Sequence, residues 1–219
     1  MLNLILKDLM VQRKTLLWGF LYVLIFSYAF STGGSAMFTA GAFAVAYLLI
    51  QTPAAHDDKC NADRMLNSLP ISRGMIVTAK YLSVVVYVAI GVVQYIAVYA
   101  IVSLIGQPFP VYPATWEAFG GLLFVSAFFA SVYYPILFRF GFMKTRYLTI
   151  ILFAGLFASG SAVVLALKQE DSLPFLSSLG ELFNAQPGWL IGCCVAGVML
   201  AMLLVSWSLS VRFYARREF

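Results

Sequence analysis

Residues 15–55 contain no charged side chain, and this feature constrains the fold more than any other. A membrane-spanning helix needs about 20 mostly apolar residues, so the run is long enough for two helices. The segment 31–35 contains two adjacent glycines and is typical of a tight turn between them. We therefore predict spans at about 15–31 and 36–53, with Pro53 marking the end of the second.

Further apolar segments follow along the chain. It is 62% hydrophobic and only 11% charged, whereas soluble domains carry about 25% charged residues. A water-soluble fold of this size has too little interior to hide that much apolar surface, so lipid must cover the excess. We expect an all-α integral membrane protein that forms one transmembrane domain over residues 1–219. The remaining spans, predicted at about 78–105, 116–138, 147–167 and 188–211, bring the number of transmembrane helices to six.

The Lys and Arg residues are distributed unevenly about these spans. With the N-terminus placed inside, all 14 of them except Lys168 fall on the cytoplasmic side. Cytoplasmic loops carry such an excess, so we predict cytoplasmic N and C termini and a multi-pass location in the cytoplasmic membrane. The net charge of +5 is spread in short clusters between apolar runs, which argues against nucleic-acid binding.

Residues 1–14 precede the first span and carry a helical pattern of their own. Leu2, Ile5, Leu6 and Leu9 recur at the spacing of one helix face. We interpret this segment as an interfacial helix that lies along the cytoplasmic surface. The alternative is that it only extends the first span.

The sequence lacks an internal source of energy. It contains no G-x-x-x-x-G-K-[ST] phosphate loop, so this chain does not bind ATP in that way. No charged residue lies deep inside a predicted span, which disfavours a secondary transporter driven by a buried titratable group. His56 is the sole histidine, so metal-ligand spacing is absent and a nucleophile–base pair is poorly supported. We expect no catalytic residue, no metal site and no enzyme activity, and we interpret the three cysteines as packing residues.

The longest cytoplasmic stretch lies between the second and third spans, from about 54 to 77. Asp57 or Asp58 is expected to cap the start of a short helix there, and Pro70 to stop it. The apolar face of that helix would consist of Met65, Leu66 and Leu69. Such a helix can dock in a groove of a soluble partner. A plain re-entry turn whose charges only enforce topology fits the pattern equally well.

Several segments, spread in order along nearly the whole chain, carry a likeness to a known family. They are Leu4–Lys14, Asp58-Lys59, Asp63-Arg64, Leu66–Arg73 and Pro135–Gly141. In this order they resemble the small ABC-2-type permeases, which are the membrane subunits of bacterial ABC exporters. Ala62 departs from the family pattern, in which an aromatic residue is common.

The resemblance implies how such a chain works. The permease would dimerise with itself or with a paralogous permease within membrane lipid, and two copies of a separate ABC ATPase would bind beneath it. That partner would hold ATP and Mg²⁺, and this chain would bind no cofactor. The loop would act as the coupling helix seated in the ATPase. Its coupling residues would be Asp57, Asp58, Lys59, Asp63, Arg64, Met65, Leu66, Leu69 and Pro70.

Relatives of this kind are linked to the export of amphipathic or antimicrobial peptides and lipid-like compounds. We therefore predict the permease subunit of a bacterial ABC exporter for amphipathic peptides or for lipid-like or toxic compounds. The alternative is a non-transport membrane sensor or an assembly factor of a resistance system. The residues predicted to line a substrate path are Phe124, Phe128, Tyr133 and Gln94; helix packing is the other interpretation of these side chains. The loop at 168–187 is expected to form a short interfacial helix over the outer mouth.

Overall fold

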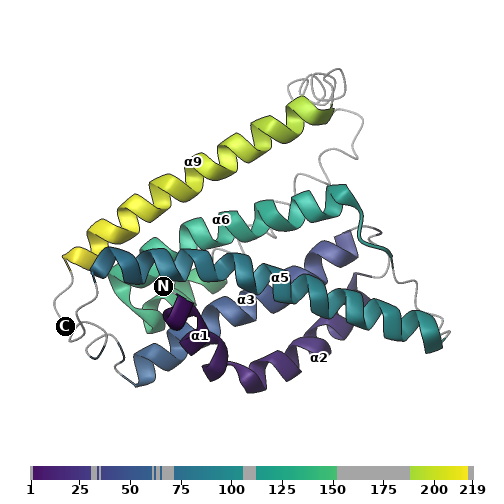
Figure 1. Ribbon diagram of the computed structural model, residues 1–219, viewed down its shortest axis with the longest axis horizontal. Helices are drawn as coiled ribbons and strands as arrows, with labels where there is room; N and C mark the ends of the chain where they lie inside the picture. The colour runs from purple at the N-terminus through teal and green to yellow at the C-terminus, as the bar shows by residue number, and fades with distance from the viewer. Residues whose placement is uncertain are drawn as a thin grey trace.

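The protein is described by a computed structural model, which covers residues 2–30, 34, 36–60, 62, 65, 72–105, 112–151 and 188–216. Within these residues the chain forms helices and contains no strand. The helices are α1 (Leu2–Val11), α2 (Arg13–Ala29), α3 (Ala36–Lys59), α5 (Arg73–Ile105), α6 (Trp116–Phe140) and α9 (Gly188–Ala215). Residues 142–151 are also helical. Figure 1 shows the long helices running in broadly the same direction, with α9 at one edge and α2 at the opposite edge.

Among the described residues, four helices are long and apolar enough to cross a membrane: α3, α5, α6 and the part of α9 from Gly192 to Ala215. The pair α1 and α2, bent by 66° at their junction, becomes a fifth candidate when it is taken as one broken span. The all-helical integral membrane fold is therefore confirmed. The total of six spans stays a prediction, because the predicted span 147–167 lies mostly outside the described residues, as does the loop at 168–187.

The predicted end of the second span at Pro53 is wrong as a helix boundary. α3 continues through Pro53 to Lys59. Proline costs a helix one hydrogen bond, but it is tolerated in membrane helices where neighbouring groups compensate. Pro53 frees the carbonyl of Leu49, and the Thr52 hydroxyl beside it makes an additional bond within the same turn, to the Leu48 carbonyl at 2.8 Å. The expected helix start at Asp57 or Asp58 is wrong for the same reason, because both residues lie in the last turn of α3.

The centre of the bundle is the contact between α3 and α5. A Cβ atom built on Gly91 of α5 would lie 2.5 Å from the carbonyl oxygen of Ala42 on α3. Only a residue without a side chain allows two helix backbones to approach this closely, as is common between membrane helices. α2 packs beside this pair through one stripe, on which Gly19, Val23 and Ser27 are buried.

α6 and α9 are joined at the proline of α6. Pro135 lies inside α6 and has no backbone N–H, so the carbonyl of Ser131, four residues earlier, lacks its helical donor. The Ser206 hydroxyl of α9 donates to that carbonyl at 2.7 Å. Tyr81 of α5 hydrogen-bonds Ser206 and Ser210 through its hydroxyl. Helices that are far apart in the sequence are thereby tied together around one freed carbonyl.

The start of α5 and the ends of α6 and α9 meet at one end of the bundle. Arg73, at the start of α5, donates through Nη1 to the carbonyl of Ala215 on α9 at 2.7 Å. Arg139, near the end of α6, lies over the ring of Phe213 with its guanidinium carbon 5.2 Å from the ring centroid. Figure 1 shows α1 and the yellow end of α9 toward the same side. We call this the basic end; that it faces the cytoplasm stays a prediction from the charge rule.

Candidate coupling site and apolar pocket

α1 turns one unexpected face to the bundle. Ile5 and Asp8 of α1 are buried, as is Gln12 just after it, with Asp8 only 3% and Gln12 0% exposed. Leu6 and Met10, in contrast, are 48% and 59% exposed. Ile5 therefore packs on the bundle while Leu6 does not, and the interfacial location of this helix stays a prediction. The segment is a separate helix, bent away from α2 by 66°, rather than a straight extension of it.

Asp8 belongs to a cluster of four charged side chains from three helices. Lys80 of α5 lies 2.9 Å from a carboxylate oxygen of Asp8 and 2.7 Å from one of Asp57, measured from its Nζ atom. The Nζ atom of Lys7 lies 2.9 Å from the second carboxylate oxygen of Asp57 and 3.5 Å from the second carboxylate oxygen of Asp8. We call these four residues the charge cluster. It joins α1, the last turn of α3 and the start of α5.

The charge cluster is largely hidden from solvent. The side chains of Asp8, Asp57 and Lys80 are 5%, 14% and 15% exposed, while Lys7 remains 31% exposed. Two cations balance two anions, and each carboxylate lies near both ammonium groups. Buried charges are tolerated when they are paired in this way, and the removal of one partner leaves an uncompensated charge. The cluster therefore requires all three helices to be in place together.

Neighbouring hydrogen bonds fix the same elements. The Gln12 side-chain amide, at the junction of α1 and α2, donates to the Tyr87 hydroxyl of α5 at 3.2 Å. The Tyr134 hydroxyl of α6 donates to the backbone carbonyl of Lys80 at 2.9 Å. Lys80 is thus held through its side chain by α1 and α3 and through its backbone by α6.

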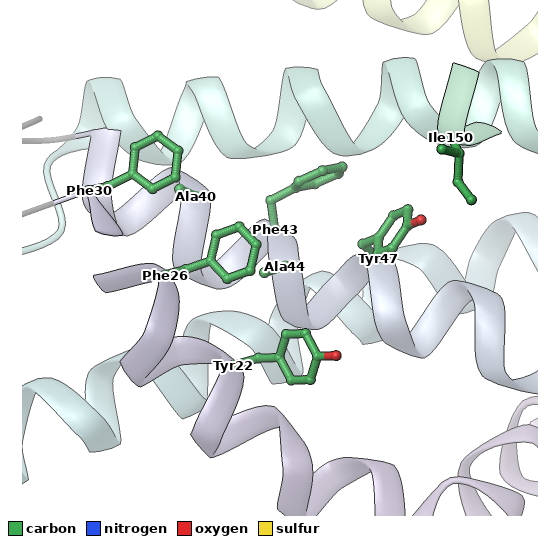
Figure 2. Close-up of a pocket in the computed structure, with 8 residues that line it drawn as sticks. All are labelled: Tyr22, Phe26, Phe30, Ala40, Phe43, Ala44, Tyr47 and Ile150. Carbon is green, nitrogen blue, oxygen red and sulfur yellow. The ribbon is translucent and has the colours of Figure 1, made fainter. Parts of the chain in front are cut away.

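A second feature is an apolar pocket of about 340 Å³ between α2 and α3. Figure 2 shows aromatic rings from both helices around it, with Ile150 at one side. Its lining residues are Tyr22, Phe26, Phe30, Ala40, Phe43, Ala44, Tyr47 and Ile150. The size and the largely apolar wall suit a small-molecule or side-chain ligand. The sequence carried a signal for it, because the aromatic residues 22, 26 and 30 repeat at the spacing of one helix face.

Comparison with known families gives the class of protein. The profile described as ABC-2 family transporter protein matches residues 3–215, which is nearly the whole chain. The protein belongs to the ABC-2 transporter family. It is an ABC-2-type permease and a multi-pass protein of the cell membrane, as predicted. No curated protein and no solved structure matches the chain.

Family membership also bears on partners and chemistry. ABC-2 permeases are membrane transport components that normally work with an ABC ATPase subunit and are generally not catalytic themselves. In the described part of the permease, no group of three His, Cys, Asp or Glu side chains is placed to hold a metal ion. Cys60, Cys193 and Cys194 are free and exposed, so the last two lie on the outside of α9 rather than in helix packing.

The predicted coupling residues fall into three groups. The carboxylate of Asp57 forms ion pairs with Lys7 and Lys80, so this side chain points into the permease. Asp58 and Lys59 are exposed at the end of α3, and Met65 is 59% exposed. The remaining members lie outside the described residues: Asp63, Arg64, Leu66, Leu69 and Pro70.

The residues predicted to line a substrate path lie in different surroundings, and their role stays a prediction. Gln94 donates from its side-chain amide to the Leu16 carbonyl of α2 at 2.9 Å, so it bonds a neighbouring helix. Tyr133 is only 1% exposed and stacks on Phe129 with 5.2 Å between ring centroids. Phe124 is 36% exposed, and Phe128 is partly buried one turn along α6. None of the four lines the apolar pocket between α2 and α3.

Proposed function

We propose that this permease is the membrane subunit of a bacterial ABC exporter that moves amphipathic peptides or lipid-like compounds out of the cell. ATP and Mg²⁺ would be bound by a separate ABC ATPase. Two permease subunits, identical or paralogous, would assemble with two ATPase subunits. The observation that carries this proposal is the family match over residues 3–215, and several apolar helices of membrane-spanning length support it.

The apolar pocket supports the proposed class of cargo. Its wall is built from aromatic rings and alanine methyl groups, with the tyrosine hydroxyls of Tyr22 and Tyr47 as the only side-chain polar atoms among its lining residues. Such a site favours an acyl chain or a bulky apolar side chain over a charged solute. A cargo with one apolar part and one polar part could place the former here.

The loop after α3 is the proposed contact with the ATPase. It follows directly on Lys59, where α3 ends, and the exposed Asp58, Lys59 and Met65 belong to this region. ATPase closure can bias the membrane helices only through contacts that differ between its states. A loop at the basic end, continuous with a central helix of the bundle, is suited to such a contact.

The coupling part is tested in reconstituted vesicles. The tagged permease, purified with the ATP-hydrolysing subunit that accompanies it, should stimulate ATP hydrolysis. Leu69→Asp, in the predicted coupling helix, should abolish the stimulation while membrane insertion persists. Leu104→Asp serves as the matched control, because Leu104 is 86% exposed near the opposite end of α5. If wild type and Leu69→Asp stimulate ATP hydrolysis equally, the loop after α3 is not the contact with the ATPase. If no ATP-hydrolysing subunit accompanies the permease, the alternative of a membrane sensor is favoured.

The cargo part is tested by filling the pocket. Ala44→Phe adds a ring where Ala44 lines the wall, and Ala201→Phe adds the same ring on the exposed side of α9. We expect Ala44→Phe alone to slow the efflux of a dansyl-labelled amphipathic peptide or of a short-chain fluorescent phospholipid. The probe that is affected identifies the cargo class. Unaltered efflux of both probes would rule out the pocket as a cargo site.

A further inference from the structure

Lys80 occupies an unusual position among the charged residues of the permease. It is the one member of the charge cluster that binds both acids at distances below 3 Å, with Asp8 on α1 and Asp57 on α3. Those two helices are separated in the sequence by the whole of α2. A single ammonium group therefore connects the N-terminal helix to the end of α3.

α3 and α5 do not depend on this connection to stay together. They are already in close backbone contact where Gly91 meets Ala42, and an extensive apolar core lies between them. α1 is different, because Leu6, Met10 and Val11 on its outer side are exposed. Its inward contacts include Leu4, Ile5 and Leu9 and the polar bonds of Asp8 and Gln12.

Stability alone gives little reason for a buried charge cluster. Replacing buried ion pairs by well-packed apolar side chains is often neutral or stabilising. In some proteins, buried polar or charged groups instead specify one relative position of the helices that carry them. The cluster is thus suited to hold α1, α3 and α5 in register rather than to add free energy of folding.

The charge cluster also lies next to the loop that the ATPase would move. Asp57 is in the last turn of α3, directly before the proposed coupling loop. A displacement of that loop reaches Asp57 before it reaches the apolar core. Through Lys80 it then acts on α5, and through Asp8 it acts on α1.

We propose that Lys80 is a positioning residue that makes α1, the end of α3 and the start of α5 move as one unit when the ATPase moves the loop. This inference rests on the proposed function, because it concerns how movement of the ATPase would reach the spans. It assigns a mechanical role to Asp8 and Lys7, which lie far from the loop in the sequence.

The test neutralises the cluster without leaving a buried charge. The triple variant Asp8→Asn, Asp57→Asn and Lys80→Met keeps side-chain size, and the remaining Lys7 reaches solvent. The variant is reconstituted in vesicles with the ATPase. We expect its membrane insertion and its basal ATP hydrolysis to persist. The ATP hydrolysis that is stimulated by the dansyl-labelled amphipathic peptide should fall by about tenfold. Lys80→Arg, which keeps the charge, should retain most of the stimulation. A triple variant that couples as well as wild type would overturn the role of Lys80.

A distance measurement addresses the same point without altering the cluster. Spin labels are placed on the native Cys60, just after α3, and on Met10→Cys of α1, with Cys193 and Cys194 replaced by Ala. The labelled permease is diluted with an excess of cysteine-free permease, so that only distances within one subunit are measured. We expect one narrow distance distribution that is the same with and without trapped nucleotide, and a broad one in the triple variant. If the distance between the two labels changes with nucleotide while the charge cluster is intact, α1 and the end of α3 move relative to each other, and the proposal is overturned. If the wild-type permease shows no nucleotide-driven transport, it is instead the proposed function that is overturned.

Discussion

The Ser206 hydroxyl donates to the Ser131 carbonyl at 2.7 Å, and that carbonyl is the one that Pro135 leaves without a helical donor. A proline in α6 and a serine in α9 thus form one structural unit. Satisfying a freed carbonyl from a neighbouring helix is how membrane helices accommodate proline. Since Tyr81 bonds the same hydroxyl, the unit also reaches α5.

We expect Ser206→Ala to destabilise the permease by about 1 kcal/mol, because interhelical hydrogen bonds in membranes are worth roughly that amount. Pro135→Ala restores the backbone donor for Ser131, so the double variant should recover most of the loss. Thermal unfolding in detergent measures both effects. Ser208→Ala is the matched control, since the Ser208 hydroxyl donates within its own helix to Val205. A double variant less stable than Ser206→Ala alone would contradict this account.

Gly91→Ala should weaken the contact between α3 and α5. The added methyl group would lie 2.5 Å from the Ala42 carbonyl oxygen, which is backbone and cannot rotate away. Overpacking of this kind costs about 1–3 kcal/mol, measurable as a lower unfolding temperature in detergent. Gly197→Ala on α9 introduces the same group where nothing lies within 4 Å and should be neutral. Equal effects of the two substitutions would show that helix propensity, not contact, decides.

Thr115→Ala should loosen the first turn of α6. Thr115 is the N-cap residue, and its hydroxyl accepts from the Ala118 N–H at 3.2 Å. Loss of such a cap costs about 0.5–2 kcal/mol, so we expect faster hydrogen exchange in peptides that cover residues 116–119. Thr115→Ser keeps the acceptor and should exchange like wild type. Unchanged exchange in Thr115→Ala would mean that water replaces the cap at no cost.

Lys80→Met alone should be far more damaging than the neutral triple variant. Of the four members of the charge cluster, it leaves the buried carboxylates of Asp8 and Asp57 with Lys7 alone as a cation. Breaking a buried pair from one side costs about 3–5 kcal/mol, which should appear as a large loss of folded protein in detergent. The neutral triple variant should recover most of that yield. If the single and triple variants are equally stable, the carboxylates are not in a low-dielectric site.

The helical elements were predictable because a charge-free segment of about 20 residues has few alternatives in a membrane. Their ends were less predictable. Pro53 stops helices in water, but in this bundle α3 continues past it. Asp57 was therefore expected at the start of a helix that faces a partner. Instead it lies in the last turn of α3, where the ammonium groups of Lys7 and Lys80 bind it.

The charge cluster could not be predicted from topology rules, which use Lys and Arg and give little weight to acids. Lys7 and Lys80 were therefore interpreted only as markers of the cytoplasmic side. Their pairing with Asp8 and Asp57 depends on the 66° bend between α1 and α2. The apolar pocket was missed for a related reason. A cavity forms where large rings face small residues of another helix, as Phe26 faces the segment with Ala40 and Ala44, and one helix sequence shows only half of that arrangement.

The close approach of Gly91 to Ala42 and the ion pair of Lys80 with Asp57 hold α5 against α3 at two separate points. At a rise of 1.5 Å per residue, these points lie about 16 Å apart along α5, and Ile105 lies about 21 Å beyond Gly91. Two such contacts fix the angle between the helices, whereas one contact would leave them free to tilt. A displacement of the basic end of α3 is therefore carried along α5 as far as Ile105.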